Sequence, residues 1–294
     1  MIYIILNILA SVLLLGIFKL FDKYKVNSFH AIIVNYFAAS VTGLIFSKHN
    51  YDIDILLNST WVYVCIPLGF LLISIFYLIS LTTQKISIST ASVANKMSVV
   101  MPVLFSVFVL HESLTALKII GIVLALVALY FATHSESGSN ANTKKLFYLP
   151  ILVFIGSGLI DVAINATNAF FIKSDQDGEM FTISSFAFAF VIGICVILFQ
   201  RLRAISTHTT APAFELKSLI GGIVLGIPNY FSIFFILKSL ESNVLSSAQL
   251  FPVLNISNVI LATLIGFLIF KEKLSRKNMA GVVIALIAIV CITL

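Results

Sequence analysis

Charged residues are scarce in this chain. Asp, Glu, Lys and Arg make up 10% of its 294 residues, and hydrophobic residues make up 60%. A soluble domain carries about 25% charged and about 45–50% apolar residues. The charged residues are too few to form the water-exposed surface of a soluble domain. The composition therefore places the chain in a lipid bilayer. Nucleic acid is not an expected partner, because the basic residues behind the net charge of +6 lie in short stretches between apolar runs.

Cysteine is rare, and the motifs of cofactor sites are missing from the sequence. The three cysteines lie within apolar runs, so neither a disulfide framework nor a zinc spacing is present. None of the five histidines pairs with another at short spacing. The glycine-rich stretch Gly221 to Gly226 lacks the Lys-Ser/Thr of a phosphate loop, and its Gly222 and Gly226 have the spacing of closely packed helices. We therefore expect no cofactor, no metal and no enzymatic activity.

Long apolar runs are abundant instead. A membrane-spanning helix needs about 20 mostly apolar residues. The runs predict ten spans, at about residues 2–21, 28–47, 61–82, 88–110, 115–133, 147–171, 180–200, 217–239, 244–270 and 276–294. The first run lacks a basic leader and a small-residue cleavage site, so we interpret it as a retained helix. A polar linker at 134–146 separates a first five-helix unit (1–133) from a second (147–294).

The two units repeat each other. Glu112, Leu114 and Gly121 recur, at a constant spacing of 160 residues, as Glu272, Leu274 and Gly281. Because each unit has an odd number of spans, the second unit enters the membrane from the opposite side. The sequence therefore predicts an all-α integral membrane protein of ten helices in two inverted five-helix repeats, with a binding site near the midplane between them.

The basic residues predict an orientation in the membrane. Twelve of the 18 Lys and Arg residues fall in or beside odd-numbered connections, four in even-numbered ones, and Lys19 and Lys96 fall within spans. Connections rich in Lys and Arg stay in the cytoplasm. We therefore expect a multi-pass protein of the plasma (inner) membrane with both termini on the extracytoplasmic side.

The matched endings of the two units also carry a family resemblance. Pro102 stands ten residues before Glu112, Leu114 follows, and Gly121 begins the last apolar helix of the unit. With the same Glu, Leu and Gly in the second unit, this arrangement resembles the drug/metabolite transporter superfamily, and within it the ten-helix EamA-like family.

The resemblance implies both an architecture and an activity. The third, fourth, eighth and ninth spans would surround a central cavity near the first, second, sixth and seventh, with the fifth and tenth at the periphery. Members of the family generally move small metabolites, often outward, as secondary transporters. One departure is Ala262, which stands where the first unit has Pro102.

Lys96, beside Asn95, is the most informative single residue. It lies close to the centre of the span at 88–110, where a charge costs roughly 2.5–3.5 kcal/mol. Asp161, in the other unit, is the only acidic residue at a comparable depth. Two interpretations stay open. Either Lys96 is buried in a structural pair with Asp161 or with backbone carbonyls, or it lines a cavity and attracts an anionic or carboxylate-bearing substrate. Asp161 is also a candidate to relay a coupling proton.

Other polar residues within the spans are candidates for the same cavity or for helix packing. Asp161, Asn165 and Asn168 recur at i, i+4 and i+7 and form one polar stripe. The remaining candidates for substrate contact are Asn35, Asn229, Tyr230, Gln249, Asn255 and Asn258. Pro228 directly precedes two of them and indicates either a broken helix that faces a site near the midplane or a packed kink.

Three charged residues are expected to be structural. Lys19, near the inner end of the first span, can extend its ammonium group to the membrane surface. Glu112 and Glu272 lie at short turns and are expected to cap the fifth and tenth spans.

The pattern favours a secondary transporter that works by alternating access. Export of amino-acid-like compounds or organic anions is the preferred activity, because one ammonium group and several amides would line the pocket. Transport of sugars or other neutral metabolites is an alternative. From different classes, an intramembrane lipid-modifying enzyme or a channel also stays open. The expected partners are a small-molecule substrate, the lipid bilayer and a candidate coupling proton, while the oligomeric state is left open.

Overall fold

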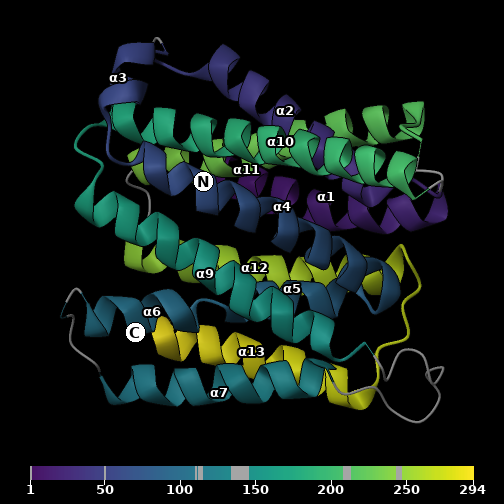
Figure 1. Cartoon of the computed structure of the whole chain (residues 1–294). Helices are drawn as coiled ribbons and strands as arrows, with labels where there is room; N and C mark the ends of the chain where they lie inside the picture. Colours follow the sequence, from purple (N-terminus) through teal and green to yellow (C-terminus); the bar gives the residue numbers. More distant parts are fainter. Residues whose placement is uncertain are drawn as a thin grey trace.

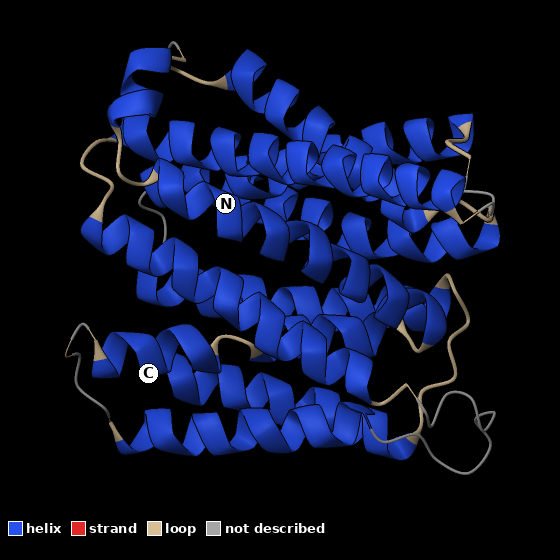
Figure 2. Ribbon diagram, in the orientation of Figure 1, coloured by secondary structure: helices blue, strands red, loops and turns tan. Residues whose placement is uncertain are grey.

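The computed structural model describes residues 2–49, 51–109, 111, 115–133, 146–207, 213–242 and 247–294, with all side chains in these ranges except those of residues 237, 240, 241, 247–252 and 293. Within these ranges every regular secondary-structure element is a helix (Figure 2). The first half forms α1 (Ile2–Lys23), α2 (Ser28–Phe46), α3 (Ile53–Asn58), α4 (Val62–Lys85), α5 (Ile88–Met97), α6 (Val100–Phe108) and α7 (Ala116–Thr133). The second half forms α9 (Tyr148–Phe170), α10 (Asp175–Ser206), α11 (Leu216–Glu241), α12 (Ser247–Leu268) and α13 (Arg276–Thr293).

The helices have the length and composition of membrane spans. In the described ranges seven segments are long and apolar enough to cross a bilayer, and two shorter helices, Ala116–Phe131 and Val253–Leu268, are also apolar. If α5 and α6 are taken as one interrupted segment and the short α3 is set aside, the helices follow the ten predicted spans in order. The prediction of an all-α integral membrane protein is confirmed.

The packing of the helices repeats when the two halves are exchanged. α2 packs on α11, and its repeat-mate pair is α4 on α10. In the same way α1 packs on α11 and on α12, while α9 packs on α4 and on α5. α7 and α13, the last helices of the two halves, pack on each other at one edge (Figure 1). Two halves inserted in opposite directions produce this arrangement.

The bundle has two distinct ends. In Figure 1 both chain termini lie at the left, together with the connections at 47–52 and 171–174. We call this end the terminal face. The connections at 24–27, 86–87 and 269–275 lie at the opposite end, which we call the linker face.

Glycines allow the two halves to approach closely. A Cβ atom added to Gly226 of α11 would lie 2.6 Å from Ala38 Cβ and 2.6 Å from the Asn35 carbonyl oxygen of α2. On the repeat-related interface, a Cβ added to Gly69 of α4 would lie 2.8 Å from the Ala189 nitrogen of α10. Small residues at such positions are the usual means of close helix packing in membranes.

Two elements differ from the predicted spans. The short α3 was not predicted, and its first turn is capped by the Asp52 side chain, which accepts from the Asp54 nitrogen at 2.8 Å. α10 begins at Asp175 rather than near residue 180, because Ser174 caps it and accepts from the Asp177 nitrogen at 3.1 Å. Acidic residues in a first helical turn also favour the helix dipole.

Candidate substrate-binding site

The fourth span is broken at its middle. α5 ends at Met97 and α6 begins at Val100, and Ser98 lies between them. The reason is Pro102, which has no N–H to donate to the Ser98 carbonyl four residues earlier and whose ring crowds that carbonyl. The Ser98 carbonyl instead accepts from the Met101 nitrogen at 2.9 Å, in a tighter turn. A helix broken at this depth is where transporters place binding sites.

The predicted break at Pro228 is absent from the described structure, because α11 runs through it from Leu216 to Glu241. The prediction placed the broken helix in the wrong span. Pro102 carried the same sequence signal and lies directly after Lys96 and Ser98, so it would have located the break.

Asp161 reaches the break from the other half of the chain. Its Oδ2 accepts from Ser98 Oγ at 3.2 Å, and Ser98 Oγ also lies 2.6 Å from the Asn95 carbonyl oxygen. Gly158, one turn before Asp161, has no side chain where Met101 of α6 packs against α9. One turn after Asp161, Asn165 Nδ2 lies 3.5 Å from Ser106 Oγ of α6. Two of the three residues of the predicted polar stripe, Asp161 and Asn165, therefore face the broken span.

Lys96 and Asp161 do not form a direct ion pair. The ion pairs among the described residues are Lys19–Glu272, His49–Glu179 and Lys85–Asp22. Lys96 is half-buried, and Asp161 is exposed although it lies in the middle of a helix. Among the described residues no hydrogen-bond acceptor pairs with Lys96 Nζ. The two charges therefore stand near the same break and act on each other electrostatically, without a direct ion pair.

The broken helix itself stabilises both charges. Lys96 lies in the last turn of α5, where the negative end of the helix dipole favours a cation. Asp161 hydrogen-bonds to Ser98, next to the beginning of α6, where the positive end favours an anion. Each such interaction contributes roughly 0.3–1 kcal/mol at exposed sites and up to about 2 kcal/mol in partly buried ones. The site can hold one positive and one negative group at once.

α12, which packs on α5, forms another wall of the site around the broken helix. At the linker face a Cβ added to Gly266 of α12 would lie 3.6 Å from Ile88 Cβ of α5, and the two helices run antiparallel. Asn258 lies eight residues before Gly266 and Lys96 eight residues after Ile88, so both lie about 12 Å from that contact at 1.5 Å per residue. Asn258 is 3% exposed, and its Oδ1 has no hydrogen-bond partner among the described residues.

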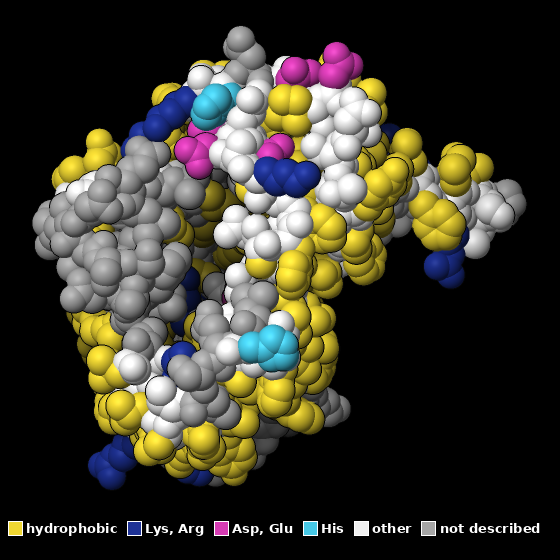
Figure 3. Space-filling view, turned by 90° about the vertical axis from the view of Figure 1, so that its left-hand side faces the viewer, with side chains coloured by type: hydrophobic (Ala, Val, Ile, Leu, Met, Phe, Trp, Pro, Cys, Tyr) yellow, Lys and Arg dark blue, Asp and Glu magenta, His cyan; other side chains and the backbone are white. Residues whose placement is uncertain are grey.

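We call Lys96, Asp161, Asn165 and Asn258 the central site. Asn255 lies one turn before Asn258 and is half-buried. Figure 3 looks onto the terminal face and shows a hollow at mid-height with basic side chains visible inside it. This hollow gives the bundle an opening on that face.

Other predicted residues lie elsewhere. Asn229 Nδ2 donates to Asn35 Oδ1 at 3.2 Å, so these two residues join α11 to α2 in a buried interface. Tyr230 is also buried and lies near the terminal face. Asn168, at the end of α9, is exposed and has no hydrogen bond to a described residue. Gln249 lies in α12, but its side chain is outside the described residues.

The linker face carries a contact that the sequence did not suggest. Lys19 Nζ lies 2.9 Å from Glu272 Oε1, with the side chains 19% and 6% exposed. Lys19 Nζ also donates to the Thr83 carbonyl oxygen at 3.1 Å. The two Glu272 carboxylate oxygens accept from the Ile88 nitrogen at 3.0 and 3.1 Å. We call these residues the linker-face clamp.

The expectations for Lys19 and Glu272 were therefore wrong. Lys19 does not extend to the membrane surface, because a buried carboxylate holds it. Glu272 caps α5 in the opposite half, while Ser275 caps α13 by accepting from the Asn278 nitrogen at 3.2 Å. Glu112, the repeat-mate of Glu272, lies outside the described residues.

These features define a class of protein. An inverted-repeat membrane bundle with a broken helix at mid-depth, and with charged and amide side chains around it, is an architecture of secondary transporters. The sequence pattern of the EamA-like transporter family matches residues 2–133. An uncharacterized protein of Haemophilus influenzae is 30% identical over 294 residues, which cover 98% of this chain and 96% of that protein. The chain belongs to the EamA-like transporter family, within the drug/metabolite transporter superfamily.

A solved crystal structure is similar in fold. It aligns with a TM-score of 0.59 at 16% sequence identity and covers 97% of this chain and 94% of its own. At that identity the similarity concerns the fold alone. The family and the fold together make this chain a multi-pass membrane transporter.

Proposed function

We propose that the chain exports amino-acid-like metabolites or organic anions by alternating access, as a secondary transporter. The observation that carries this proposal is the pair of opposite charges, Lys96 and Asp161, that stand at the broken helix without a direct ion pair. Each has a helix end to stabilise it, and neither has an ion-pair partner among the described residues.

The chemistry of the central site favours a substrate with both charges. A carboxylate on the substrate would bind Lys96, and an ammonium group would bind Asp161, which already accepts from Ser98. Charge-assisted hydrogen bonds of this kind are roughly twice as strong as neutral ones. An organic anion would use Lys96 alone. A sugar would bring no charge to either group, so neutral metabolites are the weaker alternative.

The two ends of the bundle support alternating access. The hollow reaches the terminal face (Figure 3), while the linker-face clamp joins α1, α4, α5 and the connection before α13. We propose that transport opens the clamp and closes the terminal face around the same central site. Asp161 is the residue we propose for coupling to a proton, because it is an acidic group at the midplane.

We also propose that the linker face is cytoplasmic and that the protein resides in the inner membrane. Lys85 and Lys271 at this face belong to the basic majority of the connections. A reporter fused after Leu294 is therefore expected to be found outside the cytoplasm. Phosphatase activity of a periplasmic reporter, with a cytoplasmic fluorescent reporter as its counterpart, measures this. Recovery of the C-terminus in the cytosol would reverse the orientation and with it the proposed direction.

The proposed activity is tested by a metabolite panel in proteoliposomes. The panel contains the common amino acids, small organic acids and sugars. Asp161→Asn is expected to lower saturable transport of the amino-acid substrate by about tenfold, because a charged hydrogen bond contributes about 1.5–3 kcal/mol. It should also remove any acceleration by an imposed proton gradient. Asp54→Asn, at an exposed acidic residue of α3, is the matched control and should leave both unchanged.

Each result of the panel decides between the functions. Non-saturable flux would favour a channel. Saturable transport of sugars alone, or transport unaffected by Asp161→Asn, would contradict the amphoteric central site. Counterflow from the inside to the outside of oriented vesicles tests the direction of export.

A further inference from the structure

A second polar pocket lies at the terminal face, between the ends of α2, α10 and α11. Its cavity volume is about 40 Å³, and it is lined, among others, by Phe46, Lys48, Glu179, Tyr230, Phe234 and Lys238. We call it the outer pocket. It shares no residue with the central site, whose charges come from α5 and α9.

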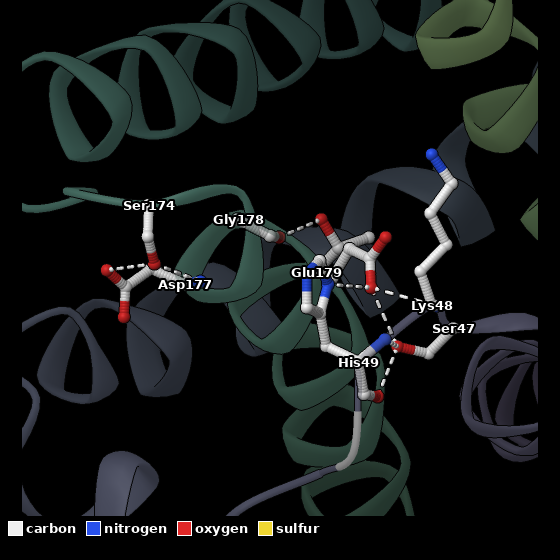
Figure 4. Close-up of polar contacts among 8 residues, drawn as sticks. Ser47, Lys48, His49, Ser174, Asp177, Gly178 and Glu179 are labelled. Atoms are coloured by element: carbon white, nitrogen blue, oxygen red, sulfur yellow. Dashed lines mark hydrogen bonds and ion pairs between the residues drawn. The ribbon is translucent and has the colours of Figure 1, made fainter.

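The acidic group of the outer pocket is held in one orientation. Glu179 Oε2 accepts from Ser47 Oγ at 2.7 Å, from the Lys48 nitrogen at 3.2 Å and from His49 Nδ1 at 3.1 Å. Figure 4 shows all three contacts meeting at one carboxylate oxygen, while the second oxygen contacts none of the other residues drawn. Among the described residues, the contacts of Glu179 therefore use one of its two carboxylate oxygens.

Aromatic rings form an apolar wall beside this carboxylate. Tyr230 and Phe234 are stacked with their centroids 6.1 Å apart, and Phe46 packs edge-on against Phe231 at 5.1 Å. Tyr230 is held from behind, because a Cβ added to Gly43 of α2 would lie 3.1 Å from Tyr230 Cε2. A fixed ring wall offers apolar surface to a ligand and also attracts cations to its faces.

Basic side chains complete the lining. Lys48 and Lys238 both line the pocket, and Lys238 Nζ lies 5.7 Å from the centroid of the Phe234 ring. Figure 4 shows the Lys48 side chain extending away from its own backbone contact with Glu179. The outer pocket thus combines one carboxylate, two ammonium groups and an aromatic wall. A purely cationic or purely anionic ligand would use only part of this set.

We propose that the outer pocket is a second binding station for amphoteric ligands of the α-amino-acid type that carry an apolar side chain. The ligand ammonium group binds the second oxygen of Glu179, its carboxylate lies toward Lys48 and Lys238, and its side chain packs on Tyr230 and Phe234. This inference rests on the proposed function and deepens it, because it adds a preference for apolar side chains and a site on the terminal face.

Equilibrium binding to the full chain in lipid nanodiscs tests the proposal. The probes are the twenty tritiated protein L-α-amino acids, with their methyl esters and N-acetyl forms as competitors. The native chain is expected to bind two molecules, and Lys96→Ala/Asp161→Asn is expected to keep one. Adding Glu179→Gln should weaken that remaining site by about tenfold or more. Asp177→Asn is the matched control, because Asp177 hydrogen-bonds to Ser174 Oγ at 3.0 Å and points away from Glu179 (Figure 4).

The outcomes separate the two proposals. If Lys96→Ala/Asp161→Asn binds nothing while the native chain binds one molecule, the outer station is wrong and the central site stands. If that double variant binds as tightly as the native chain, and Glu179→Gln abolishes the binding, the outer station stands without the central site. If adding Glu179→Gln to the double variant leaves the remaining binding unchanged, the outer station is wrong. If the native chain binds none of the probes, both proposals are wrong.

The melting temperature of Glu179→Gln and a second variant, Phe234→Ala, distinguish a loss of binding from a loss of fold. Glutamine keeps an acceptor for Ser47 and Lys48, so the melting temperature of Glu179→Gln should stay close to the native value. Phe234→Ala should remove the preference of the outer pocket for leucine and phenylalanine over glycine. An unchanged preference would contradict the role of the aromatic wall.

Discussion

Replacing Lys96 by alanine is expected to lower saturable transport by about 10- to 100-fold. The estimate follows from the roughly 1.5–3 kcal/mol of a hydrogen bond to a charged group, since each 1.4 kcal/mol is a factor of about ten. Lys96 has no ion-pair partner among the described residues, so its ammonium group is available for a substrate carboxylate. Initial rates in proteoliposomes measure the loss. Lys85→Ala, at an exposed lysine that pairs with Asp22 at 3.5 Å, is the control.

A double variant separates substrate contact from a structural pairing of Lys96 with Asp161. If the two charges only stabilise each other, Lys96→Ala/Asp161→Asn should transport no worse than either single variant, because removing both partners leaves no lone charge. If each charge binds its own group on the substrate, the two losses should add. Additive losses with an unchanged melting temperature are the result we expect, and non-additive losses would favour the structural interpretation.

Replacing Lys19 by methionine is expected to open the linker face and to lower stability. Removing one partner of a buried ion pair costs about 3–5 kcal/mol, and Lys19 keeps 19% exposure, so we expect about 3 kcal/mol. Glu272 would then hold α5 without its cation. A cysteine at Ser89, one residue beyond Ile88 and 1% exposed, reports the opening. In a chain without native cysteines, its alkylation by a maleimide added from the linker side should become at least about tenfold faster.

The control for this prediction lies at the same face. Asp22→Asn breaks the Lys85–Asp22 pair, whose side chains are both 52% exposed, and such surface pairs contribute about 0–1 kcal/mol. Labelling of the Ser89 cysteine should not change in this variant. If Lys19→Met lowers the melting temperature but leaves the labelling rate at the native value, the clamp is a structural contact and not a gate.

Much of the fold was predictable from local features. Apolar runs of membrane-spanning length set the number and order of the helices, because a backbone in lipid must satisfy its own hydrogen bonds. Ser174 shows the limit of this reasoning. It begins α10 several residues before the apolar run, since a cap and two acidic residues extend the helix beyond the hydrocarbon.

The candidate site was predictable in part. Lys96, Asp161 and Asn165 stand out in the sequence because charged and amide groups are costly in a bilayer, and the structure brings them to one broken helix. Their roles in binding stay predictions. Asn35 and Asn229 stood out for the same reason, yet they bond to each other between helices. Depth in a span does not tell which neighbour a polar side chain will meet.

The sequence by itself determined that the chain lives in a membrane, that it consists of two related halves, and that few polar groups lie deep inside it. These properties follow from composition and spacing along the chain. Only the tertiary structure decided that Lys19 forms an ion pair with Glu272, which lies 253 residues further along the chain. The same holds for Glu179, which the structure places in the lining of the outer pocket. The physical reason is that such contacts depend on how helices from opposite halves rotate and cross, and that is set by the packing of the whole bundle.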